Sequence, residues 1–196
     1  NLAVIVGANG SGKTSIMEGA AIAVSTIFVK MDGLYSRRID KNQVRLKAFS
    51  VGSTKDVQPQ YPVTVQAEAM TKSGVKKWER SLNKLNGSTT IGNAKEMIDL
   101  GIQFQKHLRE GDTKLILPVI AYYGTGRLWD YHREKQSDVF ETNNRMNGYM
   151  DCVDGTANIK LMMNWFAKMT VLSESGTGIR RHSRIRSSLC CHGNLL

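Results

Sequence analysis

The sequence predicts an α/β fold, and three consecutive stretches carry the prediction. Leu2 to Val6 is a continuous apolar run, as in a strand buried on both faces of a parallel sheet. A glycine-rich loop follows from Gly7 to Thr14. After Lys13, apolar residues recur at steps of three and four, which is typical of a helix. The predicted order is therefore strand, glycine loop, helix.

The middle of the chain predicts a smaller antiparallel region. From Asn42 to Leu82 apolar and polar residues alternate, and Ser73-Gly74 has the composition of a turn. Ala94 to Leu108 and Ile159 to Met169 then show helical spacing, and the apolar stripe of the second segment, which includes Trp165 and Phe166, is interpreted as core. We expect one antiparallel subdomain and two further helices.

A second core strand is expected from Lys114 to Tyr123, an apolar run that ends at Gly124. Pro118 within it is expected at the entry of the strand, because proline donates no ladder hydrogen bond. The polar stretch from Asp130 to Asn147 is predicted to be a surface loop.

Composition limits the class of protein. The chain has 196 residues, of which 41% are apolar, enough for one domain with an insertion. The longest apolar stretch, Ile16 to Val29, is too short and too polar for a membrane span and is interpreted as a buried helix. No secretory signal is visible, so a cytoplasmic location is expected. Cys152, Cys190 and Cys191 lack the spacing of a disulfide framework or a zinc site.

The net charge of +10 is concentrated near the end, where residues 176–196 hold four arginines and no acidic residue. Such a segment is either a solvated tail or a contact for a polyanion, so nucleic acid stays open as a partner.

The glycine loop fits the P-loop pattern, in which a glycine and four free positions precede Gly-Lys-Ser/Thr. Its fixed positions would occur by chance in about one chain of this length in a hundred. Glycines let successive amides face inward around a phosphate, and the start of the next helix adds positive potential. We therefore predict binding of ATP and Mg²⁺. The predicted cofactor-binding residues are Gly7, Ala8, Asn9, Gly10, Ser11, Gly12, Lys13, Thr14 and Ser15.

Two of these residues have predicted chemical roles. Lys13 is the predicted catalytic residue, since its ammonium can reach the β- and γ-phosphate oxygens, and Thr14 is the predicted Mg²⁺ ligand. Hydrolysis in this class also needs a carboxylate at the end of an apolar strand, and the run to Tyr123 ends in glycine. We therefore expect ATP binding, with hydrolysis only in a complete protein. Arg37 and Arg38 are interpreted as solvated surface charges, and Glu18 is expected to make a local contact.

Several segments resemble a known family. Val4 to Ser15 is similar to the P-loop of ABC-type ATPases related to RecF and the chromosome-maintenance proteins, in which an asparagine precedes Gly-Ser-Gly-Lys-Thr. Leu117 to Trp129 and Asn147 to Cys152, with Trp165-Phe166, resemble bacterial AAA-family proteins described as predicted ATP-binding proteins involved in virulence. Relatives of these proteins occur in phage-defence and retron systems.

This resemblance covers most of residues 1 to about 170 and implies the N-terminal part of an ABC-type ATPase head. It implies an incomplete P-loop ATPase domain over residues 1–171, with the antiparallel subdomain inserted at 42–82, and a basic tail over 172–196. It also implies DNA repair or phage defence, with a homodimer or an effector protein as partner.

Two other functions stay open. A small self-sufficient P-loop kinase would need a lid of arginines such as Arg127, Arg133 or Arg145. A non-catalytic nucleotide-binding remnant would act by interaction alone. Production of ADP separates this remnant from the other two.

Overall fold

The computed structural model describes residues 2–128, 145–155 and 159–174. The chain divides into two compact units. The first holds residues 2–124 and 145–155, and the described part of the second holds residues 125–128 and 159–174.

The helix expected after the glycine loop is present. Helix α1 spans Lys13–Val24 and continues into the 3-10 helix η1, Ser25–Phe28. Its C-terminal half is buried from Ala21 to Ala23, and all four residues of η1 are buried. Ile16 and Met17 are about half exposed, so the predicted burial is correct from Ala21 to Phe28, apart from the exposed Val24, and wrong for the start of the stretch.

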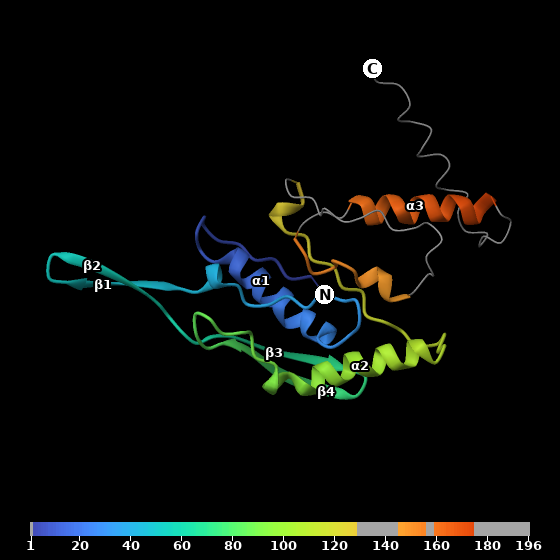
Figure 1. The fold of residues 1–196 in the computed structure, drawn as a ribbon, viewed down its shortest axis with the longest axis horizontal. Helices are drawn as coiled ribbons and strands as arrows, with labels where there is room; N and C mark the ends of the chain where they lie inside the picture. Colours follow the sequence, from blue (N-terminus) through green and yellow to red (C-terminus); the bar gives the residue numbers. More distant parts are fainter. Residues whose placement is uncertain (1, 129–144, 156–158, 175–196) are drawn as a thin grey trace, which may run out of the picture. The chain divides into compact units, whose positions relative to one another are not determined.

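The antiparallel region forms two separate hairpins rather than one meander. Strand β1 (Leu46–Val51) pairs with β2 (Thr54–Pro59), and β3 (Val63–Thr71) pairs with β4 (Gly74–Leu82). Figure 1 shows the first hairpin extending away from α1, with β2 exposed along nearly its whole length. In β3 every second residue is half-buried, which agrees with the alternation in the sequence.

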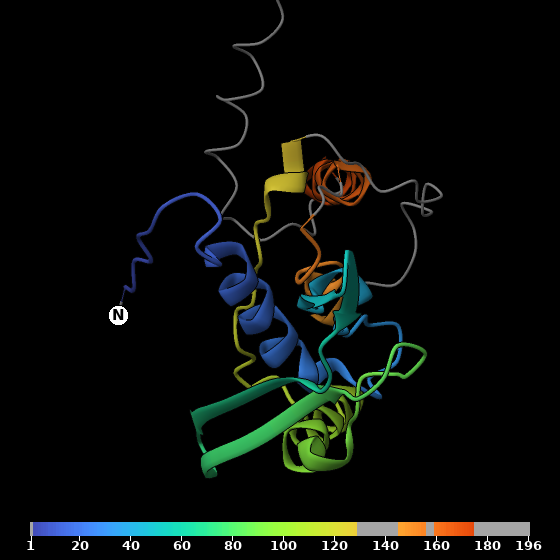
Figure 2. The same cartoon turned by 90° about the vertical axis from the view of Figure 1, so that its left-hand side faces the viewer.

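The second hairpin carries the core of the first unit. Helix α2, Lys95–Arg109, is amphipathic and packs against β4 and η1, while α1 packs against β3. Figures 1 and 2 both show the two helices lying along this hairpin. The largest buried cluster joins α1, η1, Trp78 of β4, α2 and the segment around Tyr149. The remaining short 3-10 helices of this unit are Lys41–Gln43 (η2), Gly92–Ala94 (η3) and Arg145–Tyr149 (η5).

The two predicted core strands are not strands in the structure. Leu2 to Val6 is irregular and exposed, with Leu2 91% and Val6 86% accessible. Leu115 to Tyr123 also has no strand partner; Leu117 and Ile120 pack on the core, whereas Val119 is 98% exposed. A strand exists only through hydrogen bonds to a neighbour, and within the described residues the strand pairs are confined to the two antiparallel hairpins. The expected parallel sheet is therefore absent from this part of the chain.

The second unit contains η4, Thr125–Leu128, and helix α3, Ile159–Glu174. The helix confirms the spacing in the sequence, but Met162 and Trp165 are about half exposed, so interpreting its stripe as core was wrong for them. Trp165 instead stacks edge-on against Phe166, with ring centroids 5.1 Å apart. Most of the predicted loop at 130–147 and nearly all of the predicted tail at 172–196 lie outside the described residues. No helix in the described ranges has the length and apolar character needed to cross a membrane.

Candidate nucleotide-binding site

The glycine loop has a shape that requires glycine. Gly10 and Gly12 have φ angles of 80° and 87°, in the left-handed region that side chains disfavour. A Cβ on Gly7 would lie 2.6 Å from Oγ of Ser11. The amide of Ser11 donates to the carbonyl of Ala8 at 3.2 Å and closes the loop. The geometry thus accounts for glycine at positions 7, 10 and 12 of the loop.

Lys13 lies folded over this loop. Its Nζ donates to the carbonyls of Gly7 and Ala8, both at 2.7 Å, and lies 3.5 Å from Oγ of Ser11. An ammonium group carries three hydrogens. The two short bonds fix the ammonium above the loop, and the third hydrogen has only the long contact, which a phosphate oxygen could replace.

The start of α1 completes the anion-binding geometry. Gly12 is the N-cap residue of α1, and no side-chain hydrogen bond caps this end of the helix among the described residues. The first turn of α1 also holds no acidic residue. The first intrahelical bond runs from the amide of Ile16 to Gly12 at 3.0 Å, so the amides of the first turn have no acceptor within the helix. Thr14 and Ser15 are exposed at this end. The start of the helix thus supplies amide donors, and Lys13 supplies a cation, which are the groups that bind phosphate at such loops.

Comparison with known proteins agrees with this geometry. The sequence pattern of a family described as AAA domain matches residues 1–169.

This chain belongs to the AAA domain family. It is accordingly a P-loop ATPase domain, in a family that uses ATP, and its mixed helices and antiparallel hairpins are consistent with the α/β class. No curated protein matches the chain.

The described residues of the AAA domain offer Mg²⁺ one predicted protein ligand, Thr14. The hydroxyl of Thr14 is exposed at the start of α1, where it could ligate a cation shared with bound phosphates. Among the side chains that the structure describes, no three histidine, cysteine or carboxylate groups form a metal-binding cluster. Mg²⁺ commonly keeps several waters and takes its other oxygens from substrate phosphates. The site therefore fits Mg²⁺ carried by a nucleotide rather than a metal bound by protein alone.

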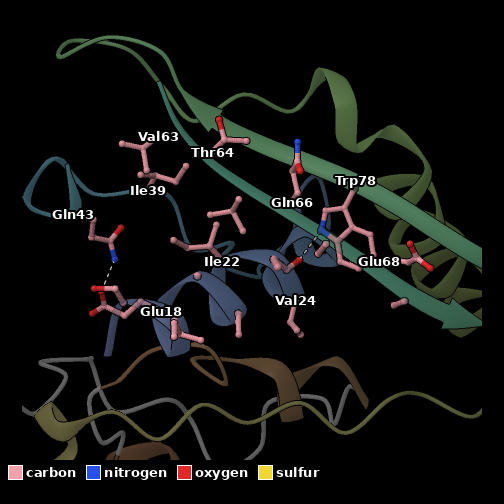
Figure 3. Close-up of a pocket in the computed structure, with 18 residues that line it drawn as sticks. Glu18, Ile22, Val24, Ile39, Gln43, Val63, Thr64, Gln66, Glu68 and Trp78 are labelled. Carbon is pink, nitrogen blue, oxygen red and sulfur yellow. Dashed lines mark hydrogen bonds between the residues drawn. The ribbon is translucent and has the colours of Figure 1, made fainter. Parts of the chain in front are cut away.

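An apolar groove of about 670 Å³ runs along α1 from the P-loop end. One wall is α1, from Ser15 to Val24, and the other is β3, from Val63 to Ala69, with Trp78 of β4 beside it. Figure 3 shows Glu18 and Gln43 at one end of the groove and Trp78 toward the other. Ser15 lines this groove, so the groove begins at the end of the predicted cofactor-binding loop.

The sequence did not reveal the polar contacts at the P-loop end of the groove. Glu18 accepts from Nε2 of Gln43 at 2.7 Å and pairs with Arg37 at 3.5 Å (Figure 3 shows the first contact). The side chain of Arg37 is only 21% exposed, so its interpretation as a solvated surface charge was wrong. The expected local contact of Glu18 is instead a link to residues 19 and 25 positions away. The one sequence feature that pointed to Glu18 is its spacing of four residues from Thr14, which places both side chains on the same face of the helix.

Proposed function

We propose that this AAA domain binds Mg-ATP at the loop from Gly7 to Ser15. The observation that carries the proposal is the position of Lys13, whose ammonium donates hydrogen bonds to the carbonyls of Gly7 and Ala8. The loop itself contains two glycines, Gly10 and Gly12, in the left-handed region of φ. Amides of the loop and of the first turn would hold the β- and γ-phosphates, Lys13 would neutralise their charge, and Thr14 would ligate Mg²⁺. Magnesium bound with the nucleotide would offset phosphate charge.

The domain is further proposed to be the nucleotide-binding part of an ABC-type head that acts through a homodimer or an effector protein, in DNA repair or phage defence, in the cytoplasm. The support is the resemblance of its P-loop and of Leu117 to Trp129 to such proteins. Antiparallel strands inserted after the P-loop helix agree with that type of head. Nucleic acid is a proposed partner on the basis of the basic charge balance.

The alternative function, a small P-loop kinase with a lid of arginines, finds less support, because one of the arginines named for that lid, Arg145, already binds backbone carbonyls. Its guanidinium donates to the backbone carbonyls of Asp112 at 3.2 Å and Leu115 at 2.7 Å. An arginine that holds a backbone segment has fewer donors for a phosphate.

Thermal unfolding with and without Mg-ATP tests the proposal. A ligand that binds only the native state raises the melting temperature, by about 2.7 kcal/mol of added stability at a concentration 100 times Kd. The wild-type chain should show this rise and Lys13→Ala should lose it. Lys47→Ala, on the exposed β1–β2 hairpin, is the matched control and should keep it. No rise in the wild-type chain would overturn the proposed function.

A further inference from the structure

Arg37 connects four parts of the first unit. Its amide donates to Oγ of Ser25 at 3.0 Å, at the end of α1. Its guanidinium pairs with Glu18 at 3.5 Å and donates to the carbonyl of Val153 at 3.2 Å. The same group lies 5.0 Å from the centre of the Tyr122 ring. One residue therefore contacts the P-loop helix and the segments that contain Tyr122 and Val153.

The backbone of Arg37 is fixed from β4 as well. Arg80 donates from Nη1 to the carbonyl of Arg37 at 2.8 Å and to Oγ of Ser36 at 3.0 Å. Arg80 is 2% exposed and forms no ion pair among the described residues, and its Nε has no hydrogen-bond partner there. Burial lowers the pKa of Arg80, and the nearby charge of Arg38 adds to the effect. The buried guanidinium is held by its hydrogen bonds to residues 36–37, and these bonds fix that irregular segment in return.

Glu18 links the P-loop helix to the segment at 36–37 through its contact with Arg37. It follows Thr14 by four residues and so lies on the same face of α1, about 6 Å further along the axis. Its second oxygen is held by Gln43, whose own Oε1 accepts from the amide of Asp40 at 2.8 Å. The Glu18–Arg37 distance of 3.5 Å exceeds the roughly 2.8 Å of a strong charge-assisted bond, which leaves room for the pair to tighten.

We propose that Glu18 and Arg37 are positioning residues that couple occupancy of the P-loop to the order of the segment 35–40. The inference rests on the proposed function, because phosphate bound at the first turn fixes α1 and thereby the carboxylate of Glu18. The fixed carboxylate holds Arg37, and Arg37 carries the effect to β4 and to the segments at Tyr122 and Val153. Coupling of this kind is reciprocal, so loss of the pair weakens nucleotide binding.

Amide hydrogen exchange of the full chain, with and without Mg-ATP, tests the coupling. In the wild-type chain, exchange slows both in the P-loop and in residues 35–40, where the amides of Arg37 and Ile39 are hydrogen-bonded to Ser25 and Thr89. In Glu18→Ala and Arg37→Met the P-loop is still protected by Mg-ATP, residues 35–40 no longer respond, and Kd rises about fivefold. Arg37→Lys, which keeps the charge but not the fork, recovers part of the response.

The control is Glu96→Ala, which removes an ion pair of 3.1 Å with Lys76 between α2 and β4 and leaves both responses intact. This ion pair lies outside the contacts of Glu18 and Arg37, so the variant shows whether loss of any ion pair in the unit is enough to remove the response. Protection of the wild-type P-loop without any change at 35–40 overturns the coupling and leaves the proposed function standing. Protection of neither segment in the wild-type chain overturns both. An unchanged response at 35–40 in the two pair variants also overturns the coupling.

Discussion

The indole Nε1 of Trp78 donates a hydrogen bond of 3.0 Å to the backbone carbonyl of Ala23. Both residues are buried, and the bond joins the β3–β4 hairpin to the end of the P-loop helix. Trp78 also lies beside the groove along α1 (Figure 3).

Trp78→Phe should therefore destabilise the chain by about 2 kcal/mol, because the variant loses a buried hydrogen bond as well as ring volume. Urea unfolding measures the effect. Trp165→Phe, at a position about half exposed on α3, is the control and should change stability by about 0.5 kcal/mol or less. Equal losses in the two variants would contradict the importance of the Trp78 bond.

Two helix glycines should respond in opposite ways to alanine. A Cβ on Gly101 of α2 would lie 1.9 Å from the carbonyl oxygen of Ile27, whereas a Cβ on Gly19 of α1 would meet no atom within 4 Å. Gly101→Ala should cost about 3 kcal/mol, because backbone must move where α2 crosses η1. Gly19→Ala should stabilise by about 0.5–1 kcal/mol, because alanine loses less backbone freedom in a helix. Chemical denaturation of both variants checks the signs, and a stable Gly101→Ala would show that the crossing is looser than described.

The carboxylate of Glu79 should titrate below its ordinary range. The hydrogen bond from Nε2 of Gln66, at 2.7 Å, is the main cause of its lowered pKa, and Asn93 at 3.4 Å contributes less. A lowered folded-state pKa adds stability above the ordinary value of 4.5, and that stability is lost as the pH falls through the folded-state pKa. An NMR titration should therefore show the Glu79 pKa rising in Gln66→Ala and rising less in Asn93→Ala. An unchanged value in Gln66→Ala would rule out this hydrogen bond as the cause.

The thiol of Cys152 should be unreactive at neutral pH. Burial first, and the charge of Asp151 second, raise its pKa from 9.0 to about 11. Two units of pKa lower the thiolate fraction about 100-fold at pH 8, and the thiolate is the reactive form. With Cys190 and Cys191 replaced by serine, alkylation by iodoacetamide should speed up about tenfold per pH unit until near pH 11. Asp151→Asn should shift this profile to lower pH, because it removes the nearby negative charge that raises the pKa of the thiol. The backbone should be kept, since asparagine tolerates the positive φ of 57° at this position. A midpoint near 9 would contradict the buried position of the thiol.

Much of the local structure followed from sequence patterns. The steps of three and four after Lys13 predicted α1, the spacing from Ala94 to Leu108 predicted α2, and alternation predicted the strands that became β3 and β4. The spacing of Gly7, Gly12 and Lys13 predicted the P-loop. These features depend on residues close together in the chain, so the spacing seen in the sequence directly reflects the local conformation that it favours.

The two apolar runs show where such patterns fail. Leu2 to Val6 and Leu115 to Tyr123 have the composition of core strands, yet neither pairs with another strand in the described structure. Composition records that a segment is apolar, but a strand depends on a partner segment that composition does not name. The partial burial of Arg37 and the burial of Arg80 were hidden for a similar reason, because sequence alone does not distinguish an arginine at the surface from one held inside the fold.

The sequence by itself determined the P-loop, the helices and the antiparallel strands, because glycine conformations and side-chain periodicity act over a few residues. Only the tertiary structure decided that Arg37 meets Glu18, that the buried Arg80 binds the carbonyl of Arg37, and that the β1–β2 hairpin is separate from β3–β4. Those relationships join positions from 19 to 43 residues apart, and their geometry depends on how α1 packs against the hairpin rather than on any local pattern.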